Sequence, residues 1–476
     1  MMPQGRRSGW TSRREFVGRG LAAGLGAAIV TRELVAPALA QQGERGNAGG
    51  SERLLSPAAE LPRAADFDRL DVPWYKASIS RLQEKLKEAG VAAALLSDRW
   101  NIIYFTGLFH TTTERPFAIL IPAEGMALTW FAPSLDRDLV GSWWIEDREL
   151  YFDFKHAKGG FPNEGKVAEG DPVDLTRWVW DGIRKRGYAD KTVGVDSVYD
   201  EKASATVADV APKATLKRVD DICLKMRMVK TPEELALTRR AMDYWSRMHA
   251  FARDLILKLG TDAVDFEVAQ ETMSYGADLI MKDLRRDGRP HSAVGVSIGV
   301  SVRSGVGTAY PHPNQFHYNP VRRGDALQVA GVVRVGGYGG ELYRAYQIAP
   351  WDAHREKVWD AHTESCLIQQ RESFAGVSCA HVAKAVHDHQ VKMGMRKYIY
   401  HRPAHGEGME GHQAPYIALG DFTTLQEGMT FSNEPGLYDA ESGFGYNHSD
   451  NVLVTAKGGV PMGSVPLSKE WCFLKL

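Results

Sequence analysis

The sequence has few cysteines, almost no net charge and no long apolar run. Its four cysteines lie far apart, at Cys223, Cys366, Cys379 and Cys472, and this spacing excludes a zinc knuckle and a disulfide framework. One disulfide bond remains an alternative, although we expect the four thiols to be buried and unpaired. The 58 basic and 59 acidic side chains give a net charge of −1, and no basic run or nucleic-acid motif occurs. We therefore expect no nucleic-acid partner.

A membrane span is also missing, because no stretch of the mature chain reaches the roughly 18 consecutive apolar residues that a span needs. What the sequence does have is the composition of a soluble globular protein, with 44% apolar and 25% charged residues. At 476 residues the chain is too long for one ordinary core, which predicts two domains.

Residues 1–40 have the pattern of a twin-arginine signal peptide. An arginine pair precedes Phe16, a mild apolar run spans residues 21–30, and a small-x-small tripeptide suited to signal peptidase ends at Ala40. An ordinary secretion signal or a basic tail are the alternatives. The pattern predicts a periplasmic or secreted protein that folds before it is exported.

Residues 41–73 are polar and lack periodicity, so they are interpreted as a linker. Residues 74–217 are then predicted to form an α/β domain, because helical and strand-like segments alternate. Gly-rich residues 159–170 are predicted to be a surface loop. The predicted helices cover the region of Ile79 to Leu86 and residues 175–186, and the predicted strands cover residues 91–96, 117–121, 126–131, 150–154 and 193–195.

Residues 218–476 are predicted to form an α+β domain, because helices and antiparallel-type strands fall into separate blocks. Thr231 as N-cap, Pro232 at the first helical position and acids in the first turn predict the start of a long helix. Further helices are predicted over residues 263–275, 353–371 and 381–393, and strands over residues 292–300, 325–335 and 342–349.

The densest chemistry lies in residues 401–454. His405 and His412 are seven residues apart on a glycine-rich link, and Glu434 precedes a Pro-Gly turn that fixes its direction. Imidazole and carboxylate groups bind borderline metals or move protons near neutral pH. In the plainer interpretation, Glu434 is an acidic turn residue at the surface.

Five segments resemble, in order and spacing, the pita-bread superfamily of creatinases, Xaa-Pro peptidases and methionine aminopeptidases. They read TPEELALTRRA, TAYPHPN, GDALQVAGVVRVGGYGGELYR, HGEGMEGHQAPY, and NEPGLY followed by SDNVLVT. An earlier segment, AGVAAALLSDRWNIIYFTG, is similar to the amino-terminal domain of creatinases. The resemblance covers about residues 78–467. It implies an α/β amino-terminal domain, an α+β pita-bread catalytic domain and a homodimer.

The metallopeptidases of this superfamily hold two metal ions on two Asp, one His and two Glu. The resemblance assigns those five positions to Ala330, Glu341, His405, Glu434 and Ser449. Alanine cannot bind a metal, and a serine hydroxyl is a poor replacement for a bridging carboxylate. Because two ions about 3.5–4 Å apart need bridging carboxylates, a dinuclear centre is not expected.

Two interpretations of this site remain. The favoured one is a metal-free site without a cofactor, as in creatinases, because half of the ligand set is lost and Glu341 is one methylene longer than Asp. In the other, a single divalent ion lies on Glu341, His405 and Glu434, with His448 as a conceivable fourth ligand. Glu341 could instead form a simple ion pair with Arg344.

The resemblance also implies catalytic roles. His312, in a Tyr-Pro-His-Pro sequence, matches the general acid and base of creatinases, and an imidazole suits proton transfer near neutral pH. A loop histidine held by two prolines is the plainer alternative. Glu341, His405 and Glu434 would orient water and substrate.

Four further residues are predicted to bind substrate. His412 faces the substrate in the superfamily, and Arg115 matches an arginine that holds a carboxylate across the creatinase dimer interface. Tyr343 and Tyr416 stand where creatinases have a glutamate and a second arginine, which puts creatine itself in doubt. The tyrosines near the site favour an aromatic or cationic small molecule, although core packing would explain them equally well.

The sequence thus predicts an exported, dimeric, creatinase-like hydrolase that cleaves a non-peptide C–N bond of a small molecule by His/Glu acid–base catalysis. One alternative is a mononuclear-metal, Xaa-Pro-peptidase-like hydrolase or a lyase of the same fold. Another is a non-catalytic periplasmic binding protein.

Overall fold

The computed structural model describes residues 50–58, 60–110, 114–151, 174–284, 295–312 and 318–476. The predicted signal peptide, residues 41–49 of the predicted linker and the predicted loop at 159–170 lie outside the described residues. Among the described helices, none combines the length and the apolar character of a membrane span. Leu54–Leu476 form one compact unit, so the predicted domain boundary at 217/218 stays a prediction.

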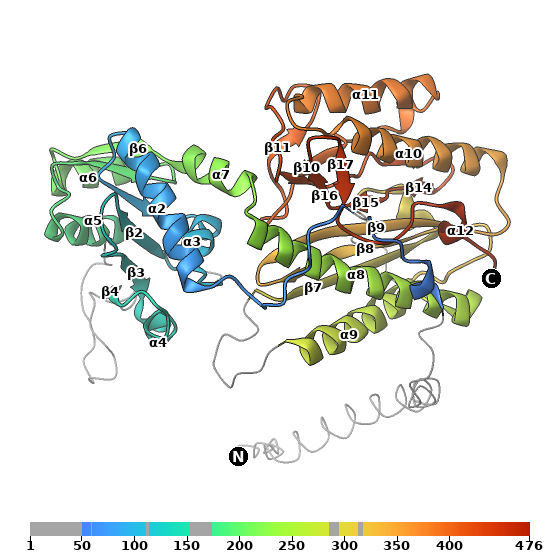
Figure 1. Cartoon of the computed structure of the whole chain (residues 1–476), viewed down its shortest axis with the longest axis horizontal. Helices are drawn as coiled ribbons and strands as arrows, with labels where there is room; N and C mark the ends of the chain where they lie inside the picture. The colour runs from blue at the N-terminus through green and yellow to red at the C-terminus, as the bar shows by residue number, and fades with distance from the viewer. Residues whose placement is uncertain (1–49, 59, 111–113, 152–173, 285–294, 313–317) are drawn as a thin grey trace, which may run out of the picture. The chain divides into compact units, whose positions relative to one another are not determined.

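The amino-terminal half is built on a twisted mixed sheet with helices on both faces (Figure 1). Strands β1 and β2 are antiparallel, whereas β1, β5 and β6 run parallel. In the order of the sheet, the strands are β4 (Asp147–Tyr151), β3 (Thr129–Pro133), β2 (Ala118–Pro122), β1 (Ala93–Leu96), β5 (Thr192–Val195) and β6 (Thr215–Arg218).

Successive residues of these strands point to opposite faces, and each face has its own core. Ala94 and Leu96 pack with helix α2 (Val72–Glu88), which brings Ile79, Leu82 and Leu86 to the sheet. Ala93 and Leu95 pack with helices α5 (Leu175–Lys185) and α6 (Glu201–Val210). The predicted α/β domain is therefore confirmed.

The carboxy-terminal half is the α+β domain that the sequence predicts. Its main sheet has the order β15 (Ser449–Asp450), β9 (Tyr338–Ile348), β8 (Ala326–Val335) and β7 (Ser297–Ser304), and β18 (Phe473–Leu474) pairs with β9. A second sheet has the order β11 (Gln413–Ile417), β10 (Ala404–Gly406), β12 (Thr430–Phe431), β16 (Val452–Val454) and β17 (Gly459–Pro461). Strands β13 (Leu437–Asp439) and β14 (Phe444–Tyr446) form a hairpin.

Helices enclose the main sheet on both sides. Helices α8 (Pro232–Leu259) and α9 (Asp265–Asp283) lie along one face, and α10 (Ala353–Glu372), with α11 (Cys379–Lys392) against it, lies over the other (Figure 1). Trp359 of α10 donates its indole N–H to the carbonyl of Ala345 in β9 (3.4 Å). This packing buries the centre of β9, where the site described below begins.

Two local signals position these elements. Thr231 caps α8 as predicted: its hydroxyl accepts the N–H of Glu234, whose carboxylate accepts the N–H of Thr231 (2.7 Å). Gly336 and Gly337 have φ of 57° and 86° and connect β8 to β9 in a two-residue turn, which favours glycine at both positions.

Several elements differ from the predictions. Helices α3 (Arg99–Thr106) and α7 (Asp220–Met228) were not predicted, and neither were α6 and β6. The strand predicted at 292–300 is observed as β7 at 297–304, and the helix predicted at 263–275 extends to Asp283. The prediction leaves out residues 301–304, although exposed and less exposed residues alternate along the whole of β7. All four cysteines are buried and unpaired, as expected.

Candidate functional site

The site is assembled from strand ends of both carboxy-terminal sheets. Strand β9 places Glu341 and Tyr343 on one face, because residues two apart in a strand point the same way. Strand β10 lies between β11 and β12 and carries His405. Glu434 follows β12, and its N–H donates to the carbonyl of Pro403 (3.0 Å), which holds it beside β10.

Glu341, His405 and Glu434 converge in a buried triangle. The Nε2 atom of His405 lies 3.1 Å from Glu434 Oε1 and 3.7 Å from Glu341 Oε1. The exposed fractions of the three side chains are 6%, 2% and 15%. The ring of His412 stacks on His405 with centroids 3.8 Å apart, and its Nε2 lies 3.8 Å from Glu341 Oε1. The structure thus brings together four of the residues that the sequence predicts for the site, while their roles stay predictions.

The main chain fixes the orientation of the His405 ring. Its Nδ1 lies 3.2 Å from the carbonyl of Gly406, which accepts a hydrogen bond only if Nδ1 is protonated. Its Nε2 is buried and lacks a well-aligned hydrogen bond among the described residues, although Glu434 is close. Nε2 therefore points into an anionic space where either a proton or a metal cation would be stabilised.

The pKa shifts of the three side chains also indicate that a cation would be stabilised between them. Burial lowers the pKa of His405, but the carboxylates of Glu434, Glu341 and Glu407 outweigh it and raise the pKa to about 9. Burial raises the pKa of Glu341 well above its usual value, and repulsion by Glu434 and Glu407 adds to this. Burial also acts to raise the pKa of Glu434, but contact with His405 holds it below its usual value.

The donor set fits one divalent ion and not two. The ligand atoms of Glu341, His405 and His412 lie within 4.8 Å of one another, and Glu434 adjoins them, so mixed nitrogen and oxygen donors suited to a first-row metal face one space. Ala330 and Ser449 offer no carboxylate for a second ion, and the Ser449 hydroxyl only reaches Glu341 Oε2 (3.3 Å). This geometry therefore does not favour the predicted metal-free site over a site that holds one metal ion.

A cavity of about 380 Å³ opens above the triangle. Of the predicted residues, His312, Tyr343 and His412 line it together with the triangle itself. His312 is exposed at its rim, and the Tyr343 hydroxyl donates to Glu341. The other lining residues are not among those predicted from the sequence; they are Arg303, Pro311, Tyr400, His401, Arg402, Tyr438 and Asn447.

Other predicted residues lie outside the cavity lining. Tyr416 pairs with His405 across β10 and β11, and its ring lies under the guanidinium of Arg402 (4.3 Å). Arg115 pairs with the neighbouring Glu114 (2.6 Å). Their predicted contacts with substrate stay predictions, and that of Arg115 depends on a dimer.

Two alternatives for the triangle are wrong. His448 is not a metal ligand, because its Nδ1 accepts the N–H of Ala345 (3.1 Å) and its ring is buried away from the triangle. Arg344 does not pair with Glu341, because it forms a buried ion pair with Asp450 (2.8 Å). Alternation along the extended chain accounts for both, since His448 precedes β15 and faces away from its neighbour Ser449, and Arg344 of β9 faces away from Glu341.

Glu407 is a further buried carboxylate at the site, and it is not among the residues predicted from the sequence. It lies two residues after His405 in the glycine-rich link, and its Oε2 accepts the N–H of Glu341 (3.2 Å) and the amide of Asn451 (2.5 Å). Of the two carboxylates in this link, Glu407 and Glu410, only Glu407 lies two residues from His405, the spacing that puts both side chains on one face of an extended segment, and this spacing is the signal that could have identified it.

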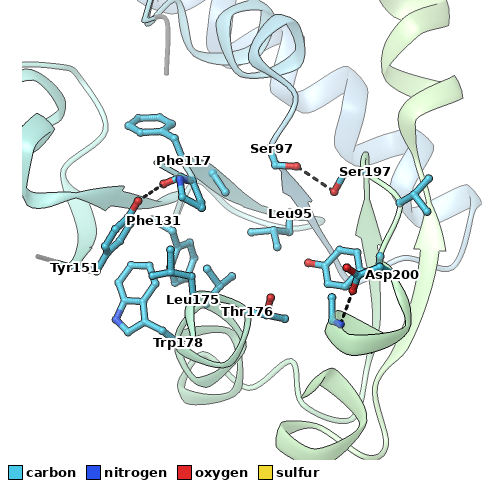
Figure 2. A pocket seen from close by; sticks show the side chains of 16 residues that line it. Leu95, Ser97, Phe117, Phe131, Tyr151, Leu175, Thr176, Trp178, Ser197 and Asp200 are labelled. Atoms are coloured by element: carbon cyan, nitrogen blue, oxygen red, sulfur yellow. Dashed lines mark hydrogen bonds between the residues drawn. The ribbon is translucent and has the colours of Figure 1, made fainter. Parts of the chain in front are cut away.

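A second cavity, of about 300 Å³, lies in the amino-terminal half at the carboxyl ends of β1 and β5 (Figure 2). Phe117, Phe131 and Trp178 form an aromatic wall opposite Ser97 and Ser197, whose hydroxyls hydrogen bond to each other (3.1 Å). Its lining contains no histidine or cysteine, so it offers no nucleophile and base pair comparable to the triangle.

Comparison with known proteins agrees with this architecture. A family model described as "Metallopeptidase family M24" matches residues 236–456, and one described as "Creatinase/Prolidase N-terminal domain" matches residues 79–229. The chain is 25% identical over 414 residues to the "Probable dipeptidase PepE" of Mycobacterium tuberculosis, covering 84% of this chain and 96% of that protein. It is 26% identical over 370 residues to the "Xaa-Pro dipeptidase" of Lactobacillus helveticus, covering 76% and 90%.

A solved prolidase from Thermococcus sibiricus has the same fold. It superposes with a TM-score of 0.68 at 22% identity, covering 86% of this chain and 100% of that one. The predicted superfamily and fold class are therefore confirmed. The predicted cleavage of a non-peptide C–N bond is wrong, because the similar proteins are named as dipeptidases and Xaa-Pro dipeptidases.

Proposed function

Because the chain belongs to the creatinase and Xaa-Pro peptidase superfamily and is a hydrolase of its M24 branch, we propose that it is a dipeptidase that uses one divalent cation. The observation that carries the proposal is the buried triangle of Glu341, His405 and Glu434 beneath an open cavity. The names of the similar dipeptidases support a peptide bond as the substrate, with Xaa-Pro dipeptides as the first class to test.

Glu341, His405 and Glu434 would hold the cation. A divalent ion bound there supplies Lewis acidity, which lowers the pKa of a water and polarises a carbonyl group. The chain's own part is to keep the ligands in place before substrate arrives. The Gly406 carbonyl orients His405, and the Ser449 and Tyr343 hydroxyls hydrogen bond to Glu341.

Hydrolysis adds one water across the peptide bond, so the hydroxyl goes to the carbonyl carbon and a proton goes to the leaving nitrogen. In our proposal, the Glu434 carboxylate accepts the proton that the attacking water loses. His312, at the rim of the cavity, delivers its ring proton to the leaving nitrogen, and the proton held by Glu434 then restores His312, so that no net proton is gained or lost. His412 Nε2 hydrogen bonds to the substrate above the triangle.

Arg303 is the proposed partner of the dipeptide's carboxylate. It extends from β7 into the cavity and donates to the carbonyl of Pro311 (3.0 Å), next to His312. A guanidinium is the natural fork for a carboxylate, and Glu341 and Glu434 would repel a carboxylate bound any deeper. Substrate would therefore lie with its free carboxylate at Arg303 and its scissile bond over the triangle.

The test is metal-dependent hydrolysis of dipeptides. Protein stripped by a chelator and given Mn²⁺ in steps should hydrolyse Xaa-Pro dipeptides with a rate that saturates near one bound ion per chain. His405→Ala should lose at least about 100-fold in Mn²⁺ affinity, whereas His381→Ala, a surface histidine of α11, should bind Mn²⁺ like the native chain.

Loaded protein that turned over no dipeptide in a broad panel would contradict the proposal. So would undiminished hydrolysis after the metal had been removed to below one ion in ten chains. Creatine and other non-peptide amidines serve as negative substrates in the same assay.

A further inference from the structure

The carboxylate of Glu407 is completely buried beside the proposed cation site. Its side chain is 0% exposed, and its Oε1 has no hydrogen-bond partner among the described residues. Its Oε2 accepts two hydrogen bonds, one from the main-chain N–H of Glu341 and one from Asn451. Burying an ionised carboxylate costs several kcal/mol of folding free energy unless a positive charge lies nearby. We therefore expect cationic side chains around Glu407.

Two cationic side chains flank Glu407 at the next residue, Gly408. Arg334 comes from β8 and donates its Nε–H to the Gly408 carbonyl (3.4 Å). Lys230 comes from the segment before α8, and its Nζ also lies close to Gly408. In the part of the chain that the structure describes, neither forms an ion pair within 4.0 Å, so their charges act on Glu407 through space.

Arg334 acts on the whole site. Strand β8 brings Arg334 to the face of the main sheet that carries Glu341, because Val332 pairs with Glu341 and Arg334 pairs with Gly339, two residues further along. Burial lowers the pKa of Arg334, and Glu407 and Glu341 oppose that fall. Arg334 is therefore a fixed cation whose field reaches both the buried carboxylate and the cation ligand.

The charges of the site balance for one ion. Where the superfamily pattern has four carboxylates, Ala330 and Ser449 have removed two and Glu407 adds one. Lys230 and the buried carboxylate of Glu234 act on each other and offset one another. Of the other charges, Glu341, Glu407 and Glu434 bring three negative charges and Arg334 brings one positive charge. The remainder is two negative charges, which a single divalent cation offsets.

We propose that Arg334 and Glu407 take the place of a second metal ion. Arg334 supplies the fixed positive charge, and Glu407 links it to Glu341 through the Glu341 main-chain N–H, so that the site accepts one divalent cation only. Both are positioning residues rather than catalytic ones, since they lie behind the ligands. The proposal rests on the proposed function in one respect, the cation on Glu341, His405 and Glu434.

The experiment is a titration of the stripped full-length chain with Mn²⁺, followed by calorimetry and by counting bound ions. Arg334→Met should bind the first ion at least about tenfold more tightly and should take up a second ion at millimolar Mn²⁺, because a repelling charge is gone. Glu407→Gln should bind the first ion about tenfold more weakly. The double variant should return to near the native affinity.

The two single variants are expected to change Mn²⁺ affinity in opposite directions, and this distinguishes charge balance from a role in supporting the fold. A purely structural role would lower affinity in both, and the double variant would be the worst of the three. Arg334→Lys should retain native binding. Lys384→Met, which removes an exposed positive charge on the surface of α11, should leave Mn²⁺ binding unchanged. If Arg334→Met does not fold, Arg334→Gln carries the same charge change with a polar side chain.

The outcomes distinguish this proposal from the proposed function. A native chain that binds one ion but hydrolyses no dipeptide overturns the function alone. A native chain that binds two ions, or an Arg334→Met variant with unchanged or weaker binding, overturns the charge replacement alone. A native chain that binds no divalent ion overturns both.

Discussion

At the scale of single residues, the cavity combines a deep anionic floor with a cationic rim. Glu341 and Glu434 lie at the floor, while Arg303 and Arg402 line the wall above them. A dipeptide has the matching polarity, because its carboxylate must be kept away from the floor while its peptide carbonyl approaches it. Arg303 is the residue that most directly tests this polarity.

We expect Arg303→Met to raise the KM for dipeptides by about 10- to 100-fold, since a bond to a charged group contributes about 1.5–3 kcal/mol. Dipeptide amides, which lack the carboxylate, should show little change in KM. Arg303 also donates to the carbonyl of Pro311, so a lower kcat for both substrate types would indicate that it mainly supports the His312 segment. Arg303→Lys is the conservative control.

His249 gives a prediction about pH. Its Nε2 donates to the carbonyl of Leu342 (2.8 Å), and burial together with the charge of Arg344 lowers its pKa to about 3. The unfolded chain, with a histidine pKa near 6.5, takes up a proton that the folded chain refuses. The free energy of unfolding should therefore be at its full value above about pH 6.5 and should fall as the pH drops towards 3.

Urea unfolding of the His249→Gln variant, measured from pH 7 to pH 4, should show a shallower dependence on pH, by up to one proton or about 1.4 kcal/mol per pH unit. His381→Gln should keep the native slope. Since His362 and His448 are also buried with lowered pKa values, some slope should remain. A variant slope equal to that of the native chain would contradict the prediction.

The sequence predicted the residues of the triangle because each lies in a motif with its own local geometry, such as Glu434 before Pro-Gly. It could not identify Arg303 or Arg334. Both residues lie more than 70 positions before His405, and only the pairing of strands brings them to the site. Glu407 was visible in the motif, but its burial depends on Asn451 and Gly340, where any larger side chain would strike both polar groups.

At the scale of elements, helix α8 is held at its start by a capping box that also contacts α2. The Thr231 hydroxyl accepts the N–H of Glu234 and the indole N–H of Trp74 (3.1 Å). We expect Thr231→Ala to lower the free energy of unfolding by about 1–2 kcal/mol, as seen for lost N-caps. Thr231→Ser keeps the hydroxyl and should stay within about 0.5 kcal/mol of the native chain in urea unfolding. Equal stability of the Ala and native chains would show that the cap contributes nothing.

The same scale explains which elements were predictable. Both helix α8 and strand β8 have a strong signal at one end. Thr-Pro marks the start of α8, and the Gly336–Gly337 turn marks the end of β8. Helix α3 was not predicted because nearly all of its residues are buried, so it lacks an amphipathic pattern, although Asp98 caps it and Gly107 ends it. Helix α6 is short and mostly exposed, which leaves almost no periodic signal.

At the scale of the whole molecule, the match to the superfamily covers the two folded halves and does not extend to residues 1–40. The role of those residues can be inferred only from their own sequence. We propose that these residues direct export by the twin-arginine route, and that the exported protein is a homodimer. Replacing Arg13 and Arg14 by lysine should retain the full-length precursor in the cytoplasm, whereas the native chain should be shortened near Ala40. Fractionation with mass measurement decides this, and native export of the double variant would contradict it.

The burial of all four cysteines has a consequence for handling the protein outside a reducing environment. Cys223, Cys366, Cys379 and Cys472 are each 0% exposed, and burial raises the pKa of all four thiols. Because the thiolate is the reactive form, oxidants and maleimides can reach these groups only in molecules that have opened. The rate at which the thiols are labelled therefore reports how often the folded chain opens, and no engineered probe is needed to measure it.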